Sequence, residues 1–223
     1  RMWRSFTHWV GGMGVLVFVM ASLPMSDCHG MHIMRAEVPG PTVGKLVSRM
    51  SDTAKILYGI YLALTLVEIA LLLAGGMPLF DACIHSFGSA GTGGFSCRNL
   101  SVVAYQNPYF DIVIGIFMLM FGVNFNLYYF LLIRRFRDVF HSEELRSYLL
   151  IVAAAVVAIT VDIAHLYDSV STSLCHAFFQ VSSIITTTGY ATTDFNAWPT
   201  FSKGILVVLM FIGACAGSTG GGI

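Results

Sequence analysis

The sequence predicts an all-α polytopic membrane protein, built from repeated units of a helix, a re-entrant helix, a loop and a second helix. Two observations predict this class. Hydrophobic residues make up 56% of the 223 residues and charged residues only 11%, whereas about a quarter of a soluble domain is charged. In addition, five stretches of 20 to 25 residues carry at most one formal charge each. About 20 apolar residues suffice for a helix to cross a bilayer.

Composition excludes several other classes. With 12 basic and 12 acidic residues the formal net charge is zero, so the chain offers no basic field for nucleic acid. The high apolar content excludes a disordered chain and a coiled coil. The five cysteines form no C-x-x-C pair, which excludes a zinc ribbon and a disulfide framework. Cys28, His29 and His32 lack a fourth ligand, so no resident metal or cofactor is expected.

The five stretches with at most one charge are the predicted membrane spans. They cover residues 5–26, 56–80, 112–133, 147–167 and 204–223. Glu68 and Asp162 are the only charges inside them. A charge within a span is costly and often functional, but hydrogen bonding to neighbouring helices is the expectation we favour for both.

Two further segments are too short or too polar to span. Residues 81–90 and 170–185 each follow one span, precede another and lead into a cluster of threonine and glycine. We expect both to be re-entrant pore helices. Non-helical backbone at membrane depth is tolerated only where protein or water satisfies its polar groups.

Basic residues predict the orientation. Segments 25–55 and 134–146 carry four basic residues each, which assigns both to the cytoplasm. The threonine and glycine clusters are then on the extracytoplasmic side. The basic residues are Arg35, Lys45, Arg49, Lys55, Arg134, Arg135, Arg137 and Arg146.

The chain contains an internal repeat. At an offset of 95 residues Thr92 matches Thr187, Gly94 matches Gly189 and the aromatic Phe95 matches Tyr190. Pro108 and Pro199 then begin the next spans, and a glycine follows each proline 14 residues later. A match at corresponding places in two units carries more weight than a single T-x-G would.

The repeat divides the chain. Residues 1–24 are assigned as the second helix of a first repeat and 25–55 as a cytoplasmic linker. A second repeat, 56–137, has its pore helix at 81–90, its loop at 91–96 and a helix at 108–133. A third repeat, 138–223, has a helix at 147–167, a pore helix at 170–185, a loop at 186–191 and a broken helix at 200–223. A fourth repeat is absent, so we expect the chain to be a piece of a longer protein.

The two loops have the composition of a cation filter. A re-entrant helix ends at mid-membrane with its last carbonyls free, and both these carbonyls and the helix dipole favour a cation. Glycine permits the backbone angles of an extended loop, and carbonyl oxygens can replace the hydration shell of a monovalent cation. No carboxylate lies in either loop, which argues against a divalent cation. The predicted filter residues are Thr92, Gly93, Gly94, Phe95, Thr187, Thr188, Gly189 and Tyr190.

The last apolar stretch contains a gate-loop candidate. Consecutive glycines there favour an unwound segment, since each lowers helix stability by roughly 1 kcal/mol relative to alanine. The alternative is a helix-packing face, because Gly213 and Gly217 have G-x-x-x-G spacing. The candidate residues are Gly213, Gly217, Ser218, Thr219, Gly220, Gly221 and Gly222. Asn124 and Asn126 are candidates for lining a cavity at the same level.

These motifs resemble the Trk/Ktr/HKT potassium transporter superfamily, and within it the bacterial TrkH-like membrane subunits. Thr187-Thr188-Gly189-Tyr190 resembles the third filter of that family, and Gly91-Thr92-Gly93-Gly94-Phe95-Ser96 its second. The stretch from Gly213 to Gly222 resembles its intramembrane gate loop. The segment from Arg4 to Gly14 resembles the start of the first repeat's second helix. The likeness covers nearly the whole chain.

The resemblance implies four repeats around a pseudo-fourfold ion path, with potassium as the transported ion. It also implies a homodimer in the bacterial inner membrane, gated by a cytoplasmic nucleotide-binding regulatory subunit of the TrkA/KtrA type. The first and fourth filters are missing here, so a sodium-permeable member of the family stays an alternative.

Two functions of other classes would use similar sequence features. An alternating-access cation transporter, coupled to protons or sodium by symport, would use broken helices as well, and the sequence does not separate it from a channel. An intramembrane aspartyl protease would use Asp162 or Asp168, but its Gly-x-Gly-Asp partner motif does not occur. We therefore expect no enzymatic activity.

Overall fold

The computed structural model describes residues 2–14, 50–98, 101–105 and 107–222. All regular secondary structure in this part of the chain is helical, which confirms the predicted all-α class. The linker predicted to face the cytoplasm, 25–55, lies outside the described residues except for 50–55. Of the predicted first helix, only α1 (Met2–Gly12) and the two residues after it are described.

Among the described residues, two helices are long and apolar enough to cross a membrane. These are α4 (Met50–Ala74), from Ala54 onward, and α9 (Glu143–Ile163), which continues through a short 3-10 turn, η2 (Ala164–Leu166). Large apolar side chains such as Leu66 on α4 and Val161 on α9 are exposed. Exposed apolar residues on long helices are expected where the neighbour is lipid rather than water.

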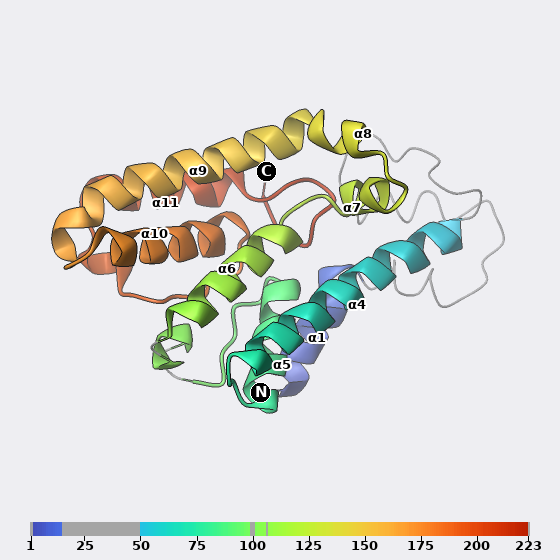
Figure 1. Cartoon of the computed structure of the whole chain (residues 1–223), viewed down its shortest axis with the longest axis horizontal. Helices are drawn as coiled ribbons and strands as arrows, with labels where there is room; N and C mark the ends of the chain where they lie inside the picture. Colours follow the sequence, from blue (N-terminus) through green and yellow to red (C-terminus); the bar gives the residue numbers. More distant parts are fainter. Residues whose placement is uncertain (1, 15–49, 99–100, 106, 223) are drawn as a thin grey trace.

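Two short helices hold the positions expected for the re-entrant segments. The first, α5 (Leu79–Ala90), follows a sharp turn at Gly75–Pro78, and the second is α10 (Val170–Ile185). Ser169 caps α10, since its side chain accepts a hydrogen bond from the Ser171 amide. Both helices end toward the middle of the molecule, where the two loops lie (Figure 1).

The predicted continuous helix over 108–133 is wrong. The segment forms α6 (Pro108–Phe121) and α7 (Phe125–Leu132), which meet at 90° across a break of three residues. Asn124 caps the new helix by accepting from the Asn126 amide. The break has a tertiary cause, because carbonyls of Phe121 and Gly122 accept hydrogen bonds from the chain after residue 212 instead of from helical amides.

The last helix ends before the uncharged stretch 204–223 does. After the short 3-10 turn η3 (Phe195–Ala197), α11 covers Thr200–Ile212, and Gly213 leaves helical geometry with φ +70°. Residues 213–222 contain no helix. The uncharged stretch 204–223 is therefore not one spanning helix but a short helix followed by a loop. Two small elements complete the description: η1 (Ser101–Tyr105) and α8 (Phe136–Phe140).

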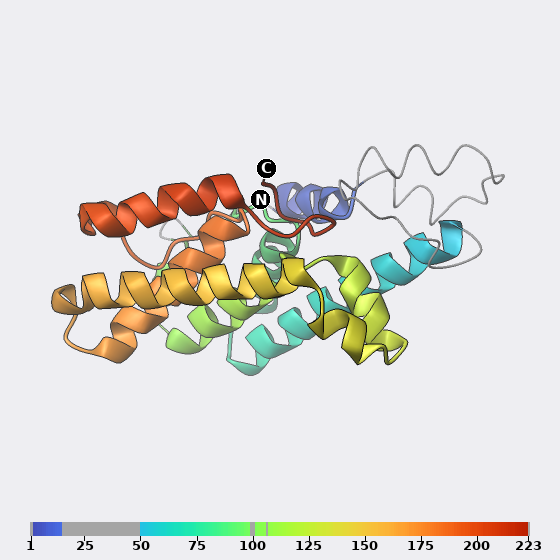
Figure 2. The same cartoon turned by 90° about the horizontal axis from the view of Figure 1, so that it is seen from above.

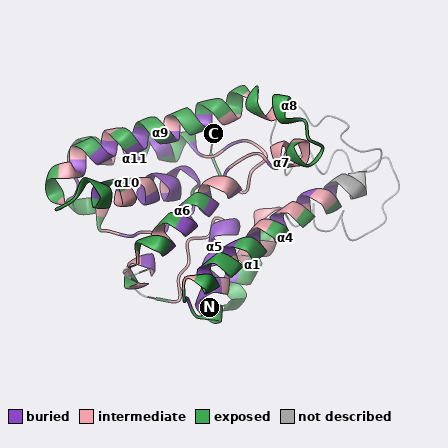
Figure 3. Ribbon diagram, viewed as in Figure 1, coloured by how far each residue is buried: buried purple, intermediate pink, exposed green. Residues whose placement is uncertain are grey.

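The helices form two groups with separate cores (Figures 1 and 2). One core joins α4, α5 and α6, and the other joins α9, α10 and α11. Buried residues line the contact faces and exposed ones the outer faces (Figure 3). The groups are interlocked, because Phe179 and Tyr190 of the second group contribute to the first core, while Leu119 and Val123 pack on the second core. This interlock places the ends of α5 and α10 together.

Candidate functional site

The loops after α5 and α10 have matching backbone conformations. Thr92 and Thr187 have φ of +49° and +57°, and Gly94 and Gly189 have φ of +62° and +87°. A positive φ is a genuine outlier for a β-branched residue such as threonine. Such strain persists only where the surroundings enforce it, and it concentrates at functional sites. The same outliers at the same offset of 95 residues indicate one shared local structure.

The hydrogen bonds that lead into the loops also match. The amide of Gly93 donates to the carbonyl of Gly88 at 2.8 Å, and the amide of Thr188 donates to the carbonyl of Ser183 at 3.0 Å. These bonds close the C-terminal turns of α5 and α10 in the same way. They leave the following carbonyls without a helical partner.

The two loops lie against each other. A Cβ added at Gly94 would overlap with the carbonyl oxygen of Thr188. No hydrogen-bond donor within residues 2–14, 50–98, 101–105 and 107–222 reaches the carbonyls of 92–94 or 187–189. The loops therefore bring together several carbonyl oxygens that no group of the described chain satisfies. Such oxygens can coordinate a dehydrated cation.

Tyr190 braces the loop of the other repeat. Its side chain is buried, and its hydroxyl lies 3.2 Å from the carbonyl of His85 and 3.3 Å from that of Phe95, so the phenol donates between them. The carbonyl of Tyr190 in turn accepts from the hydroxyl of Ser183 at 2.6 Å. The carbonyls at 95 and 190 are thus engaged, which limits the open carbonyls to the three residues before each.

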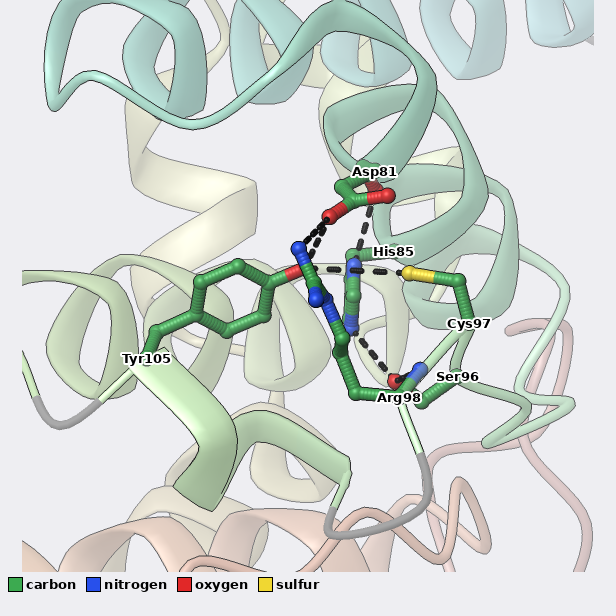
Figure 4. Close-up of polar contacts among 6 residues, drawn as sticks. All are labelled: Asp81, His85, Ser96, Cys97, Arg98 and Tyr105. Atoms are coloured by element: carbon green, nitrogen blue, oxygen red, sulfur yellow. Dashed lines mark hydrogen bonds and ion pairs between the residues drawn. The ribbon is translucent and has the colours of Figure 1, made fainter.

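A polar network supports the outer end of the first loop (Figure 4). Nδ1 of His85 lies 2.7 Å from the carbonyl of Asp81. Because a carbonyl can only accept, Nδ1 carries the proton of the neutral ring. Nε2 therefore accepts from the hydroxyl of Ser96 at 3.0 Å. The carboxylate of Asp81 accepts from the hydroxyl of Tyr105 at 2.6 Å and from Arg98 at 3.3 Å. Burial raises the pKa of Tyr105 well above its usual range, and the hydrogen bond to Asp81 raises it further. The phenol therefore keeps its proton and remains a donor.

Helix α1 covers the other side of this loop. A Cβ at Gly91 would meet the carbonyl oxygen of His8 at 2.5 Å, so the backbones touch there. The ring of Phe95 lies 5.0 Å from that of His8, and the guanidinium of Arg4 lies 3.7 Å above the same ring. Phe95 therefore anchors the loop from outside, while Tyr190 anchors it from the neighbouring repeat.

The loop 213–222 after α11 lies directly against the break between α6 and α7. The amide of Cys215 donates to Gly122 at 3.0 Å and that of Thr219 to Phe121 at 3.3 Å. The amide of Phe125 donates back to Gly217 at 3.1 Å. The break and the loop thus satisfy each other's backbone groups, as membrane depth requires.

The same loop contacts both filter candidates through their threonines. The hydroxyl of Thr92 donates to the carbonyl of Thr219 at 3.1 Å, and the hydroxyl of Thr187 accepts from the amide of Gly221 at 2.9 Å. Within the loop, the amide of Gly220 donates to the hydroxyl of Ser218, and Gly213 packs on Gly222. A small displacement of this loop must therefore disturb the base of both filter candidates.

The structure separates the remaining candidates. Asn124 lies beside Gly217 of the loop, at the predicted level, whereas Asn126 offers only its amide to the Asn124 cap. Asp162 accepts from both the amide and the hydroxyl of Ser202, which joins α9 to α11 as expected for a helix-bonding charge. Glu68 is fully buried, and neither of its oxygens finds a partner in the described residues.

The sequence alone did not identify the side chains that brace these loops. His85, Ser183 and Tyr105 were not singled out as site residues, because their hydrogen bonds depend on how the chain folds back on itself. Gly122 followed by Asn124 was a usable signal for the break, because asparagine is a strong N-cap residue. Within the described residues, no three histidine, cysteine or carboxylate side chains form a metal cluster.

Two short helices that end at loops with open carbonyls, beside an unwound loop, are typical of membrane proteins that handle cations. Comparison with known proteins identifies the particular family. All of residues 1–223 match the family described as "TrkH: Cation transport protein", and the chain belongs to this family.

Similarity to individual proteins supports this family assignment. The Trk system potassium uptake protein TrkH of Salmonella typhimurium is 40% identical over 99% of this chain and 47% of its own length. The Trk system potassium uptake protein TrkG of Escherichia coli is 36% identical over 99% of this chain and 46% of its own length. The crystal structure of the potassium transporter TrkH from Vibrio parahaemolyticus superposes with a TM-score of 0.81 at 32% identity, covering 99% of this chain and 45% of that one. The chain therefore spans about half the length of the relatives it matches.

Proposed function

We propose that the protein to which this chain belongs takes up potassium across the cell membrane through a carbonyl-lined filter. The open carbonyls of 92–94 and 187–189 supply two of its walls. The observation that carries the proposal is the shared loop geometry, with positive φ at Thr92, Gly94, Thr187 and Gly189 and no protein donor in the described residues on the intervening carbonyls. Two further repeats outside this chain would supply the remaining walls.

The loop 213–222, called the gate loop from here on, controls the path. It lies against both filter threonines and is held by backbone hydrogen bonds to the α6–α7 break. Small residues allow such a loop to change conformation at little steric cost. Asn124 lines the path beside it. The filters face the extracytoplasmic side, and the basic segments face the cytoplasm.

The family relation supports further parts of the proposal. The relatives are named potassium uptake proteins of a Trk system. We infer a homodimer in the bacterial inner membrane and a cytoplasmic nucleotide-binding regulatory subunit as partner. Coupled symport and permeability to sodium are outcomes that the uptake experiment separates from potassium conduction.

Radiotracer rubidium uptake by the full-length protein in proteoliposomes tests the function. Gly189→Asp places a carboxylate in the filter at φ +87° and should abolish selective uptake. Gly76→Asp is the matched control, because Gly76 has φ +90°, has equally open surroundings and lies in the exposed turn after α4. Unchanged flux and selectivity in Gly189→Asp would count against the filter. Uptake that saturates and follows a proton or sodium gradient would indicate symport.

A further inference from the structure

One contact of the gate loop differs in kind from all the others. Most of the loop's amides donate to backbone carbonyls or to a hydroxyl. The amide of Ala216 instead donates to Oε1 of Glu144 at 2.6 Å. This is the only carboxylate bonded to the gate loop within the described residues. A hydrogen bond to an ionised acceptor is shorter and roughly twice as strong as one between neutral groups.

Glu144 lies at the capped start of a long helix. It lies in the first turn of α9, whose N-cap Ser142 accepts from the amide of Leu145. A negative charge at this position is also favoured by the helix dipole. The residue is exposed, and among the described residues no cation pairs with its carboxylate. The carboxylate is therefore free of a competing cation there and anchors the loop to a long spanning helix.

The bond falls at the centre of the gate loop. Cys215, one residue earlier, donates to the break after α6, and Gly217, one residue later, accepts from α7. Figure 2 shows the start of α9, the loop and α7 together at this point. The loop consists mostly of glycine, alanine and serine, so its side chains bury little surface that could fix its position. Hydrogen bonds must therefore provide most of the interactions that fix the gate loop in position.

We propose that Glu144 is a positioning residue for the gate loop. Its carboxylate holds the Ala216 amide and so keeps the loop against Thr92 and Thr187, the state that obstructs the ion path. Release of this bond frees the loop and raises ion flux. The proposal rests on the proposed function of the gate loop and adds a residue from another helix that sets its resting position.

The test uses the full-length protein in proteoliposomes without a regulatory partner. Glu144→Ala removes the acceptor, Glu144→Asp withdraws it by one methylene, and Glu144→Gln keeps an oxygen at the same reach. Glu143→Ala is the matched control, since it removes the same charge from the adjacent exposed position. Basal rubidium flux is measured together with hydrogen exchange at the amides of 214–218.

The proposal predicts a roughly tenfold rise in flux for Glu144→Ala and Glu144→Asp, the change expected from losing one charge-assisted hydrogen bond. Exchange at Ala216 should quicken in both. Glu144→Gln keeps a neutral acceptor and should fall between the parent and Glu144→Ala, whereas Glu143→Ala should not differ from the parent. If Glu144→Ala does not fold, Glu144→Asp decides the outcome. Parent-like flux and exchange in the folded variants would overturn the proposal, whereas a parent protein that carries no rubidium would instead overturn the proposed function.

Discussion

Thr92 and Thr187 each meet two structural requirements. Each adopts a positive φ that turns the adjacent carbonyls out of helical direction, and each offers its hydroxyl to the gate loop. Glycine would adopt the angle more easily but has no hydroxyl. The strain at these positions is therefore explained by the contact with the gate loop, which only a hydroxyl-bearing side chain can make.

Glycine substitutions in the two loops distinguish backbone strain at positive φ from steric overlap of an added Cβ. We expect Gly94→Ala to abolish selective rubidium uptake, because its Cβ would overlap with the Thr188 carbonyl and push the two loops apart. Gly189→Ala has open space and should show mainly the strain of its positive φ, roughly 1–2 kcal/mol of stability. Gly76→Ala should lose a similar stability and keep its selectivity. Uptake and thermal unfolding of the full-length variants measure both effects, and parent-like uptake by Gly94→Ala would contradict the packing of the loops.

At the level of single elements, the sequence predicted most of the helices and the break after Ile212, but not the break between α6 and α7. The expected pore helix at 170–185 coincides with α10, because its length and its serine and threonine content set it apart from a span. The expected helix at 108–133 was wrong, because residues 112–133 carry no charge or proline and the signal of Gly122 and Asn124 was not used. Its break depends on bonds to a loop about 90 residues later in the chain, as the donation of Cys215 to Gly122 illustrates. Glu144 was invisible to sequence reasoning for the same reason.

The break itself can be tested through its cap. Asn124→Ala removes the acceptor for the Asn126 amide and should destabilise α7 by about 1 kcal/mol. The gate loop should then loosen at Gly217, which contacts Asn124. Asn124→Ser is the matched control, because serine is also a strong N-cap residue and adds no charge. Hydrogen exchange at 125–128 and 215–219 measures the change; equal protection in the alanine and serine variants would show that the cap does not support the break.

At the scale of the whole molecule, two helix groups with separate cores are joined through side chains exchanged between them. Tyr190 and Phe179 enter the first core, and α6 packs on the second. This interlock holds two structurally equivalent loops side by side, although they are 95 residues apart. The repeat was readable from the sequence because matching residues recur at a fixed offset. The contacts between its copies depend on three-dimensional packing and could not be read in that way.

We propose above all that open main-chain oxygens of these two loops bind the transported cation. Anomalous diffraction from crystals of the full-length protein soaked in rubidium tests it most directly. We predict an anomalous peak within coordination distance of carbonyls from both 92–94 and 187–189, and its loss when sodium replaces rubidium. A structure in which these carbonyls face lipid or protein donors, with no rubidium between the loops, would contradict the account.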